Sequence, residues 1–333
     1  MNEHSFAERI PDILAAFRDA EKIAITTHVN PDGDAIGSAL GLWNALTGRG
    51  KQVVVVNHSP TPANMRFLPG ADDIHVFRPE RDFPLLTTAD VICVLDVNNL
   101  PRIESVGAAV EAAQCAKIVI DHHREPQEFA DIYAIETDAS STCQMIAQLL
   151  FAGKYHISPA TATALYTGIM TDSGNFRFPR TDAALHRLVA QLIECGADPV
   201  AIYEEVFNAG SYARVKLLGR ALAGMELVAG EKICAITVHQ ADFAETGAHL
   251  DDTEGFVQNT LAIAGVQLGI LFVELDGVVK ASLRSKGSVS AANIAKQFGG
   301  GAVPPRNPRR SPGIGSSAGE SRNCRVVGIV RLI

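Results

Sequence analysis

The sequence lacks closely spaced cysteines, a long apolar run and a surplus of basic side chains. Its 6 cysteines form no C-x-x-C pair and most lie in apolar stretches, so we expect reduced thiols in the core. A membrane-spanning helix needs about 20 consecutive apolar residues, and no run approaches that length. The N-terminal segment MNEHSFAERIPDIL has acids where a signal peptide has bases. We therefore expect a soluble, cytoplasmic protein that does not associate with membranes.

The charge balance narrows the class of substrate. There are 29 basic and 37 acidic side chains, which give a formal charge of −8. A protein that grips long nucleic acid through many phosphates needs a surplus of lysine and arginine on one face, so the acidity disfavours that mode. A short anionic substrate held through metal ions is compatible with it. At 333 residues and 47% apolar composition, the chain has enough material for two globular domains.

The first two thirds of the chain alternate short β-branched runs with amphipathic stretches rich in alanine and leucine. We expect strands at 22–27, 52–56, 91–95 and 117–120, and helices near 3–20, 35–46, 106–114, 142–152, 159–171 and 182–195. This alternation is typical of βαβ units. It predicts an α/β catalytic domain over 1–194, whose parallel sheet is covered by helices on both faces.

The rest of the chain divides into three segments. Residues 195–230 predict a helical linker. Residues 231–301 contain strand-like runs at 232–239, 266–275 and 278–285 and helix-like stretches near 252–264 and 291–298, which predict a smaller α+β domain. Residues 302–333 form an atypical tail rich in glycine, proline and arginine, with 6 arginines and a single glutamate. We expect this tail to be poorly ordered.

Acids and histidines follow three of the expected strands, and another acid follows a helical stretch. They are His28, Asp32 and Asp34 in HVNPDGD, Asp96 after VICVL, Asp121, His122 and His123 after KIVI, and Asp172 in GIMTDSGNFRF. Ligands of open α/β sheets bind beyond the carboxyl ends of the strands. Each residue alone is most often a turn former, a helix cap or a surface residue. The ordered set instead predicts one shared site, whereas His58 has no comparable partners and is taken as structural.

The residue types in this set indicate metal chemistry. Carboxylates and imidazoles in these numbers are sufficient for two divalent cations, whose charge would offset the repulsion among the carboxylates. Oxygen-rich sites with a few imidazoles suit Mn²⁺ or Mg²⁺, although ligand type alone leaves zinc open.

The motifs HVNPDGDAIGS, Asp96, DHH at 121–123 and Asp172 resemble the DHH phosphoesterase family. DDTEGFVQNTLAIAGVQLGILFVE with ASLRSKG resembles the DHH-associated C-terminal domain, which in that family lies across a cleft from the catalytic domain. The resemblance covers residues 10–301. Within the family, the sequence most resembles the branch of enzymes that degrade very short oligoribonucleotides (nanoRNA) and remove a phosphate from 3′-phosphoadenosine 5′-phosphate (pAp). The resemblance implies an oligoribonuclease and bisphosphate nucleotidase in which two divalent cations, Mn²⁺ by preference, activate a water.

The resemblance also implies roles for the clustered residues. One cation would be held by His28 and Asp32, the other by Asp34, His122 and Asp172, with Asp96 bridging the two. His123 would be catalytic with Asp96, as a contact to the scissile phosphate or a proton donor to the leaving oxygen. Asp121 would orient the histidines.

Substrate binding is implied for the C-terminal domain. The candidates are Arg284, assisted by Lys286, and the glycine run Gly299, Gly300 and Gly301. The family usually continues this run with a histidine, but here Ala302 follows it and no histidine lies beyond His249. The abrupt change favours the hypothesis of an out-of-frame translation and an incomplete substrate domain. By resemblance alone we expect a homodimer.

Two other functions remain open at this point. The first is a phosphodiesterase that acts on linear or cyclic dinucleotides. The second is a non-catalytic nucleotide-binding protein whose substrate domain is impaired.

Overall fold

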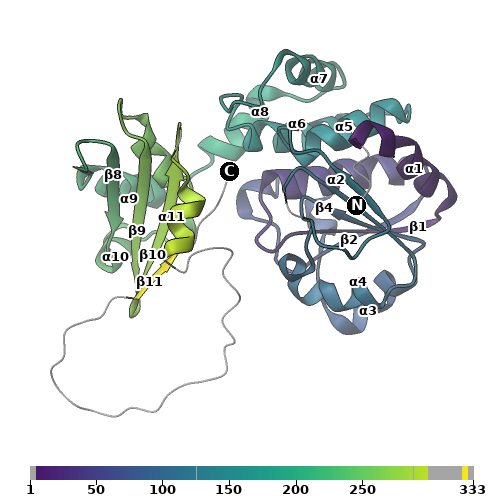
Figure 1. The fold of residues 1–333 in the computed structure, drawn as a ribbon, viewed down its shortest axis with the longest axis horizontal. Coiled ribbons are helices and arrows are strands. Elements are labelled where there is room, and N and C mark those ends of the chain that lie inside the picture. The colour runs from purple at the N-terminus through teal and green to yellow at the C-terminus, as the bar shows by residue number, and fades with distance from the viewer. Residues whose placement is uncertain (1–4, 125, 288, 299–324, 329–333) are drawn as a thin grey trace, which may run out of the picture. The chain divides into compact units, whose positions relative to one another are not determined.

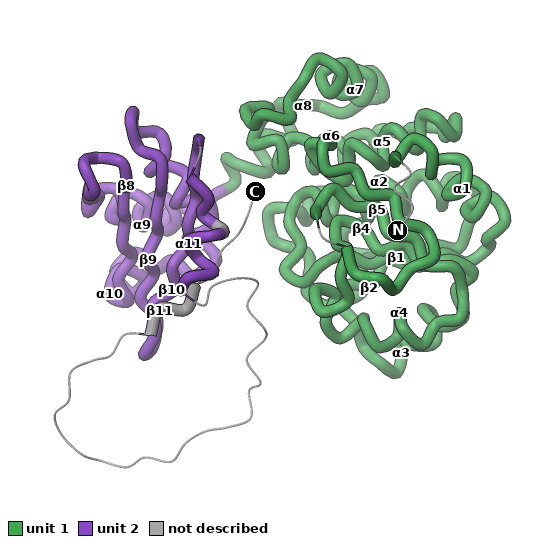
Figure 2. Tube along the Cα trace, in the orientation of Figure 1, with its two compact units in different colours: residues 1–209 green, residues 210–333 purple. Residues whose placement is uncertain are grey.

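The structure, a computed structural model, describes residues 5–124, 126–287, 289–298 and 325–328. The chain divides into two compact units, Met1–Ala209 and Gly210–Ile333, each with its own β-sheet (Figure 2). The division falls inside residues 195–230, the segment that we predict as a linker. Among the described residues, no helix has the length and apolar character that crossing a bilayer requires.

Six parallel strands of the described residues form the sheet of unit 1, in the order β3-β2-β1-β4-β5-β6 (Figure 1). They are β1 (Lys22–Thr27), β2 (Gln52–Asn57), β3 (His75–Val76), β4 (Val91–Leu95), β5 (Ala116–Asp121) and β6 (Ile132–Ile135). Every residue of β4, VICVL, is buried, as expected for a strand that is covered on both faces. The predicted α/β fold with a parallel sheet is confirmed.

Helices cover both faces of this sheet (Figure 1). One face has α1 (Phe6–Asp19), α2 (Gly33–Thr47), α5 (Thr142–Ala152), α6 (Pro159–Asp172) and α7 (Ala183–Glu194), and the other has α3 (Pro79–Thr87) and α4 (Gly107–Ala112). Ile23 and Ile25 of β1 pack in the first core and Ala24 in the second, because alternate residues of a strand point to opposite faces. Short 3₁₀ helices at Ala63–Met65, Ala71–Asp73 and Leu100–Val106, then α8 (Pro199–Tyr203) and a π-helical turn (Glu204–Asn208), complete the unit.

Helices α2 and α6 pack unusually closely because α2 has a glycine every fourth residue. A Cβ built on Gly37 would lie 2.5 Å from the backbone oxygen of Ala164, and one on Gly33 would lie 2.3 Å from Thr171 Oγ1. Side chains at these positions would force the two helices apart. The glycines therefore bring the first turn of α2 beside the last turn of α6, where Asp172 lies.

Unit 2 contains a mixed sheet in the order β11-β10-β9-β8-β7 (Figure 1). Its strands are β7 (Glu226–Val228), β8 (Ile233–Val238), β9 (Leu268–Leu275), β10 (Val278–Ser285) and β11 (Arg325–Gly328). Its helices are α9 (Tyr212–Ala223), α10 (Gln240–Thr246) and α11 (Ala291–Gln297), with 3₁₀ helices at Leu250–Thr253 and Phe256–Ala262. β8 alternates between buried and half-buried residues, and its buried Ile236 and Val238 join a core with Phe256.

One of our helix predictions for unit 2 is wrong. The segment 252–264 forms two 3₁₀ helices instead of one α-helix, because Glu254 is extended and Gly255 adopts a left-handed φ of +80° between them. In the predicted tail, Arg325–Gly328 forms β11 beside β10. The glycine run 299–301 and the other tail residues lie outside the described part of the chain.

Candidate metal centre

Strands β1, β4 and β5 are neighbours in the sheet, and each has a polar residue at its carboxyl end. His28 directly follows β1, Asp96 follows β4, and Asp121 is the last residue of β5. Parallel strands end at the same edge, so the sheet gathers these side chains. The packing of α2 on α6 adds Asp34 and Asp172. The structure therefore brings together residues that are up to 144 positions apart.

A first group, which we call the His28 group, consists of His28, Asp32 and Asp96, whose ligand atoms lie within 4.8 Å of one another. His28 Nε2 is 3.3 Å from Asp96 Oδ2 and 3.9 Å from Asp32 Oδ1. His28 Nδ1 donates to the backbone oxygen of Val29 at 2.9 Å, which turns Nε2 toward the carboxylates. Asp32 caps α2 by accepting from backbone N–H groups of the first turn, and its side chain is 51% exposed.

A second group, the His122 group, consists of Asp34, His122 and Asp172. His122 Nε2 lies 3.4 Å from Asp172 Oδ2 and 3.8 Å from Asp34 Oδ2. Asp34 is only 1% exposed. Its two oxygens accept from the backbone N–H groups of Thr142, at 2.6 Å, and Cys143, at 2.8 Å. These donors open α5, and the N-terminus of a helix stabilises a carboxylate.

Asp96 lies between the two groups. Its Oδ2 faces His28, and its Oδ1 is 3.5 Å from His122 Nε2 and accepts from Thr142 Oγ1 at 3.1 Å. Burial opposes ionisation, but the contacts with His122 and His28 outweigh it and lower the pKa of Asp96 well below its usual range. Its φ of +59° is unusual for a residue other than glycine. Such backbone strain clusters at functional sites.

The electrostatics of the His122 group favour added positive charge. Burial, and then the charge of Asp96, raise the pKa of Asp34 to about 7. Burial and the charge of Asp34 raise the pKa of Asp172 well above its usual range. Burial lowers the pKa of His122, but its carboxylate neighbours, Asp96 first, raise it overall to about 10. Buried carboxylates with imidazoles form an oxygen-rich donor set, which fits hard divalent cations such as Mn²⁺ or Mg²⁺.

Asp121 and His123 form a pair beside these groups. Asp121 is fully buried, and its Oδ1 accepts from His123 Nδ1 at 2.7 Å and from the His123 backbone N–H at 3.2 Å. Its Oδ2 is buried with no hydrogen-bond partner among the described residues. The His123 side chain is 40% exposed, so its Nε2 can meet a ligand. Asn98 Nδ2 donates to the backbone oxygens of His123 and Arg124 and steadies this turn.

Sequence patterns did not indicate several residues that support the cluster. The first-turn donors of α5, Thr142 and Cys143, hold Asp34, and Asn98 holds the turn at His123. Arg180, in the loop between α6 and α7, contacts His122. The helix start after Ser141 could have indicated that Thr142 and Cys143 bind a carboxylate, because helix N-termini bind anions. Nothing in the sequence pairs that helix start with Asp34, which is more than a hundred residues away.

The predicted substrate residues of unit 2 occupy β10 and the loop after it. The Arg284 side chain donates to the Leu283 backbone oxygen at 3.2 Å. The Lys286 ammonium donates to the backbone oxygens of Leu261 and Ile263, which ties β10 to the end of a 3₁₀ helix. Gly299, Gly300 and Gly301 lie outside the described residues.

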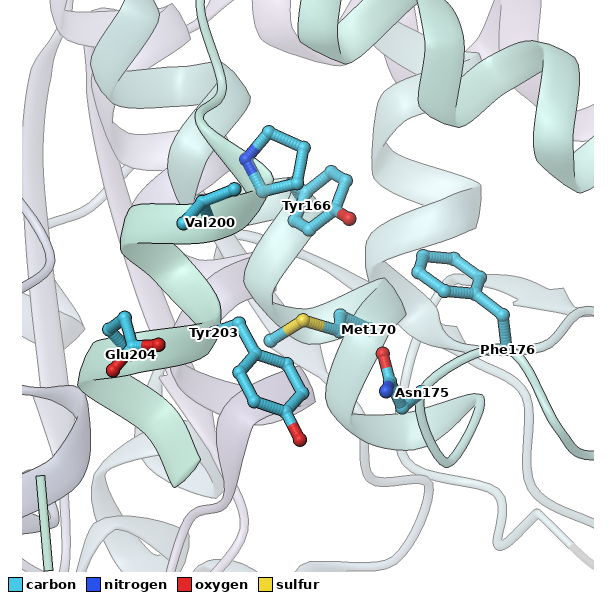
Figure 3. Close-up of a pocket in the computed structure, with 8 residues that line it drawn as sticks. Tyr166, Met170, Asn175, Phe176, Val200, Tyr203 and Glu204 are labelled. Atoms are coloured by element: carbon cyan, nitrogen blue, oxygen red, sulfur yellow. The ribbon is translucent and has the colours of Figure 1, made fainter. Parts of the chain in front are cut away.

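A separate pocket of about 320 Å³ lies at α6 and α8 (Figure 3). Tyr166 and Met170 of α6 and Tyr203 of α8 line it, and no residue of the His28 group or the His122 group does. Met170 and Asp172 are two positions apart, so their side chains leave α6 on opposite sides. The pocket is therefore not part of the candidate metal centre.

Known proteins resemble this chain in sequence and in fold. The family described as "DHH family, N-terminal domain" matches residues 22–169. The chain is 34% identical over 280 residues to the bifunctional oligoribonuclease and PAP phosphatase NrnA of Thermus thermophilus. The aligned residues make up 84% of this chain and 81% of that protein. The chain belongs to the DHH family. This DHH phosphoesterase is also 33% identical to an exopolyphosphatase-related protein of Bacteroides fragilis, with a TM-score of 0.86 over 90% of this chain and 89% of that one.

A further relative of this DHH phosphoesterase is named for a different activity. The cyclic-di-AMP phosphodiesterase GdpP of Geobacillus thermodenitrificans is 28% identical over 299 residues. The match covers 85% of this chain but only 44% of that longer protein.

Proposed function

We propose that this protein hydrolyses short oligoribonucleotides and pAp with the aid of two divalent cations. The observation that carries the proposal is the pair of Asp/His groups that meet at Asp96. The proposal also draws on the similarity to the Thermus thermophilus NrnA, whose name states both activities. Mn²⁺ is the preferred cation, with Mg²⁺ or another divalent ion as alternatives.

The two groups divide the ligands between the cations. His28 and Asp32 would hold one cation, His122 with Asp34 and Asp172 the other, and Asp96 would contact both. Cations bound there would supply Lewis-acid stabilisation of phosphate oxygens and a lowered pKa for a bound water. The anchoring of Asp34 by α5 keeps its oxygens in place, which reduces the reorganisation needed when substrate enters.

His123 has a geometry suited to the leaving group. Because Asp121 accepts from its Nδ1, the exposed Nε2 is the nitrogen that substrate would meet. That nitrogen can contact the scissile phosphate or donate a proton to the departing oxygen. Asp121 would hold the ring in position, as an acid paired with an imidazole does in other hydrolytic sites.

Substrate binding by Arg284 and the glycine run 299–301 is part of the same proposal. A guanidinium on β10 can pair with a phosphate through two parallel hydrogen bonds. Because the histidine that usually follows the glycine run is missing, we expect weaker activity on di- to pentanucleotides than in a chain with a restored glycine-histidine terminus. A homodimer is proposed on resemblance alone.

The deciding experiment measures Mn²⁺-dependent hydrolysis of a labelled RNA trinucleotide and of pAp. Asp96→Asn should reduce turnover more than about a hundredfold, because Asp96 serves both groups. The matched control is Asp72→Asn, which makes the same charge change at an exposed acid of unit 1 without a hydrogen bond or ion pair among the described residues. Equal turnover by Asp96→Asn and the control would overturn the proposed site. No turnover by folded, Mn²⁺-loaded protein would favour a nucleotide-binding role.

A second candidate function is hydrolysis of linear or cyclic dinucleotides. The similarity to GdpP over 85% of this chain favours it. The same assay should therefore include cyclic-di-AMP, its linear product and inorganic polyphosphate. A specificity constant for cyclic-di-AMP that exceeds those for the trinucleotide and pAp would replace the leading proposal.

A further inference from the structure

Arg102 is a half-buried arginine whose backbone lies against the loop that contains His28. It belongs to the 3₁₀ helix Leu100–Val106, which follows β4 and Asp96. Its backbone oxygen accepts from the Val29 N–H at 2.7 Å, so this helix and the loop after β1 lie side by side. The Arg102 guanidinium itself makes no hydrogen bond or ion pair within the described residues.

The charge of Arg102 acts on the His28 group. Burial lowers the pKa of His28, the contact with Asp96 raises it overall, and the charge of Arg102 opposes that rise. The guanidinium is thus close to the candidate metal centre, yet no carboxylate of the described residues pairs with it. Arg180, by contrast, donates to the Ala139 backbone oxygen at 3.3 Å. A partly buried charge without a counter-ion is costly, so a bound anion would stabilise Arg102.

The segment around Arg102 is fixed from two sides. Val29 holds its backbone, and Ser105 Oγ lies 2.9 Å from Nδ1 of His58, the residue that follows β2. Between these two anchors, Glu104 has a φ of +48°, which is uncommon for a residue other than glycine. Strained backbone persists where the surrounding structure enforces it, and it clusters at active sites and ligand clamps. The anchors therefore keep Arg102 beside the candidate metal centre.

We propose that Arg102 binds a phosphate oxygen of the substrate on the β1 side of the candidate metal centre. The inference rests on the proposed function, because it names a substrate contact at that same site. A guanidinium is always charged, and it can make two parallel hydrogen bonds to one phosphate. Positive charge held at the phosphate oxygens also stabilises the negative charge that develops there in the transition state.

This contact differs from the substrate residues that we propose in unit 2. Arg284 and the glycine run 299–301 belong to the domain whose terminus departs from the family pattern. Arg102 belongs to the same unit as the His28 group and the His122 group, six residues after Asp96. Phosphate binding by unit 1 should therefore persist where substrate binding by unit 2 is impaired.

Binding of AMP and of adenosine to Mn²⁺-loaded protein tests the inference, because the two ligands differ only in the phosphate. Isothermal titration calorimetry measures both affinities. Arg102→Met should weaken AMP binding about ten- to a hundredfold and leave adenosine binding unchanged. Inorganic phosphate, used as a competitor of AMP, should lose affinity by a similar factor. Arg102→Lys should recover part of the loss, because an ammonium retains the charge but lacks the planar fork.

Two controls separate a phosphate contact from a general effect of charge or of folding. Arg187→Met on α7 removes the same charge from an exposed arginine with no hydrogen bond or ion pair among the described residues, and it should leave AMP binding unchanged. Mn²⁺ binding, followed by electron paramagnetic resonance of the free ion, should not weaken in Arg102→Met. If Arg102→Met melts below the parent, Arg102→Gln replaces it, because glutamine retains a polar head.

Unchanged AMP affinity in the Arg102 variant, in protein that melts like the parent, would overturn the inference. An equal loss in Arg187→Met, an equal loss for adenosine, weaker Mn²⁺ binding or a parent that binds no AMP would overturn it as well. Failure of the proposed function looks different. In that case the parent would hydrolyse neither the RNA trinucleotide nor pAp, while AMP would still bind and its affinity would still depend on Arg102.

Discussion

The His28 and His122 groups each take one acid from the same short stretch of sequence, yet these two acids are held differently. Asp32 and Asp34 are two residues apart. Asp32 is a half-exposed helix cap, whereas Asp34 is buried and held by two backbone donors of α5. Asp32 is thus held by its own helix and reaches solvent, whereas the position of Asp34 depends on packing between distant helices. Spacing in a motif fixes which residues reach a site, but long-range packing decides how rigidly each is held.

Asparagine substitutions at Asp32 and Asp34 should give the largest difference in stability between the two groups. Asp34→Asn places an amide NH₂ against backbone donors, so we expect the free energy of unfolding to fall by about 1–3 kcal/mol. Hydrolysis should fall more than about a hundredfold. Asp32→Asn should leave stability nearly unchanged, because asparagine caps a helix as well as aspartate does. Urea unfolding and turnover of both variants provide the check, and equal losses of stability would contradict the difference between the groups.

The Asp121–His123 pair belongs to neither group, and its substitution tests a role in protonating the leaving oxygen. Asp121→Asn should slow cleavage of an RNA dinucleotide by about ten- to a hundredfold. An aryl phosphodiester has a leaving group that departs without protonation, so its cleavage should slow much less. Turnover of the two substrates by parent and variant gives the ratio. The same loss on both substrates would indicate a role in metal binding or folding instead.

Much of the fold follows from local patterns. The expected strands 22–27 and 91–95 and the helix 142–152 coincide with β1, β4 and α5, because buried β-branched runs and amphipathic periods are strong signals. β3 and β6 were missed because two to four residues show no clear period. In 252–264, the left-handed Gly255 interrupts a helical pattern. At the site, the sequence indicated which acids and histidines would gather. It could not indicate the contacts of Asp34 with α5 or of Arg180 with His122, which arise only from tertiary packing.

The close contact of α2 and α6 is what places Asp34 beside Asp172, so widening it should affect the His122 group alone. In Gly37→Ala the new Cβ meets the Ala164 backbone oxygen, which cannot move without shifting α6. We expect a loss of about 1–3 kcal/mol in stability and weaker Mn²⁺ binding at one site of two. Gly219→Ala on α9 is the matched control, since its Cβ would meet nothing within 4 Å. The control should be neutral or stabilising by about 0.5–1 kcal/mol. Full Mn²⁺ affinity in Gly37→Ala would show that helix spacing does not set the site.

Asp82 offers the sharpest contrast with Asp34, because both carboxylates are buried in unit 1 but their pKa values shift in opposite directions. Burial alone would raise the pKa of Asp82, but hydrogen bonds from Arg81, from the Arg78 backbone N–H and from His75 lower it. The folded state therefore holds the ionised form of Asp82 more strongly than the unfolded chain does.

This shift makes a specific prediction for acid solutions. The stability that Asp82 contributes is present above its unfolded pKa of about 4 and is lost as the pH falls through the lower folded pKa. Asp34 behaves oppositely without cations: its folded pKa is raised to about 7, so protonation stabilises the fold, and this contribution declines between about pH 4 and pH 7. Asp82→Asn should be less stable than the parent at pH 7, with the difference narrowing below about pH 4. Thermal melting of both chains from pH 3 to pH 7 in the presence of a chelator measures the difference in stability. A difference that stays constant across that range would show that the ionised form of Asp82 is not what holds β3 to α3.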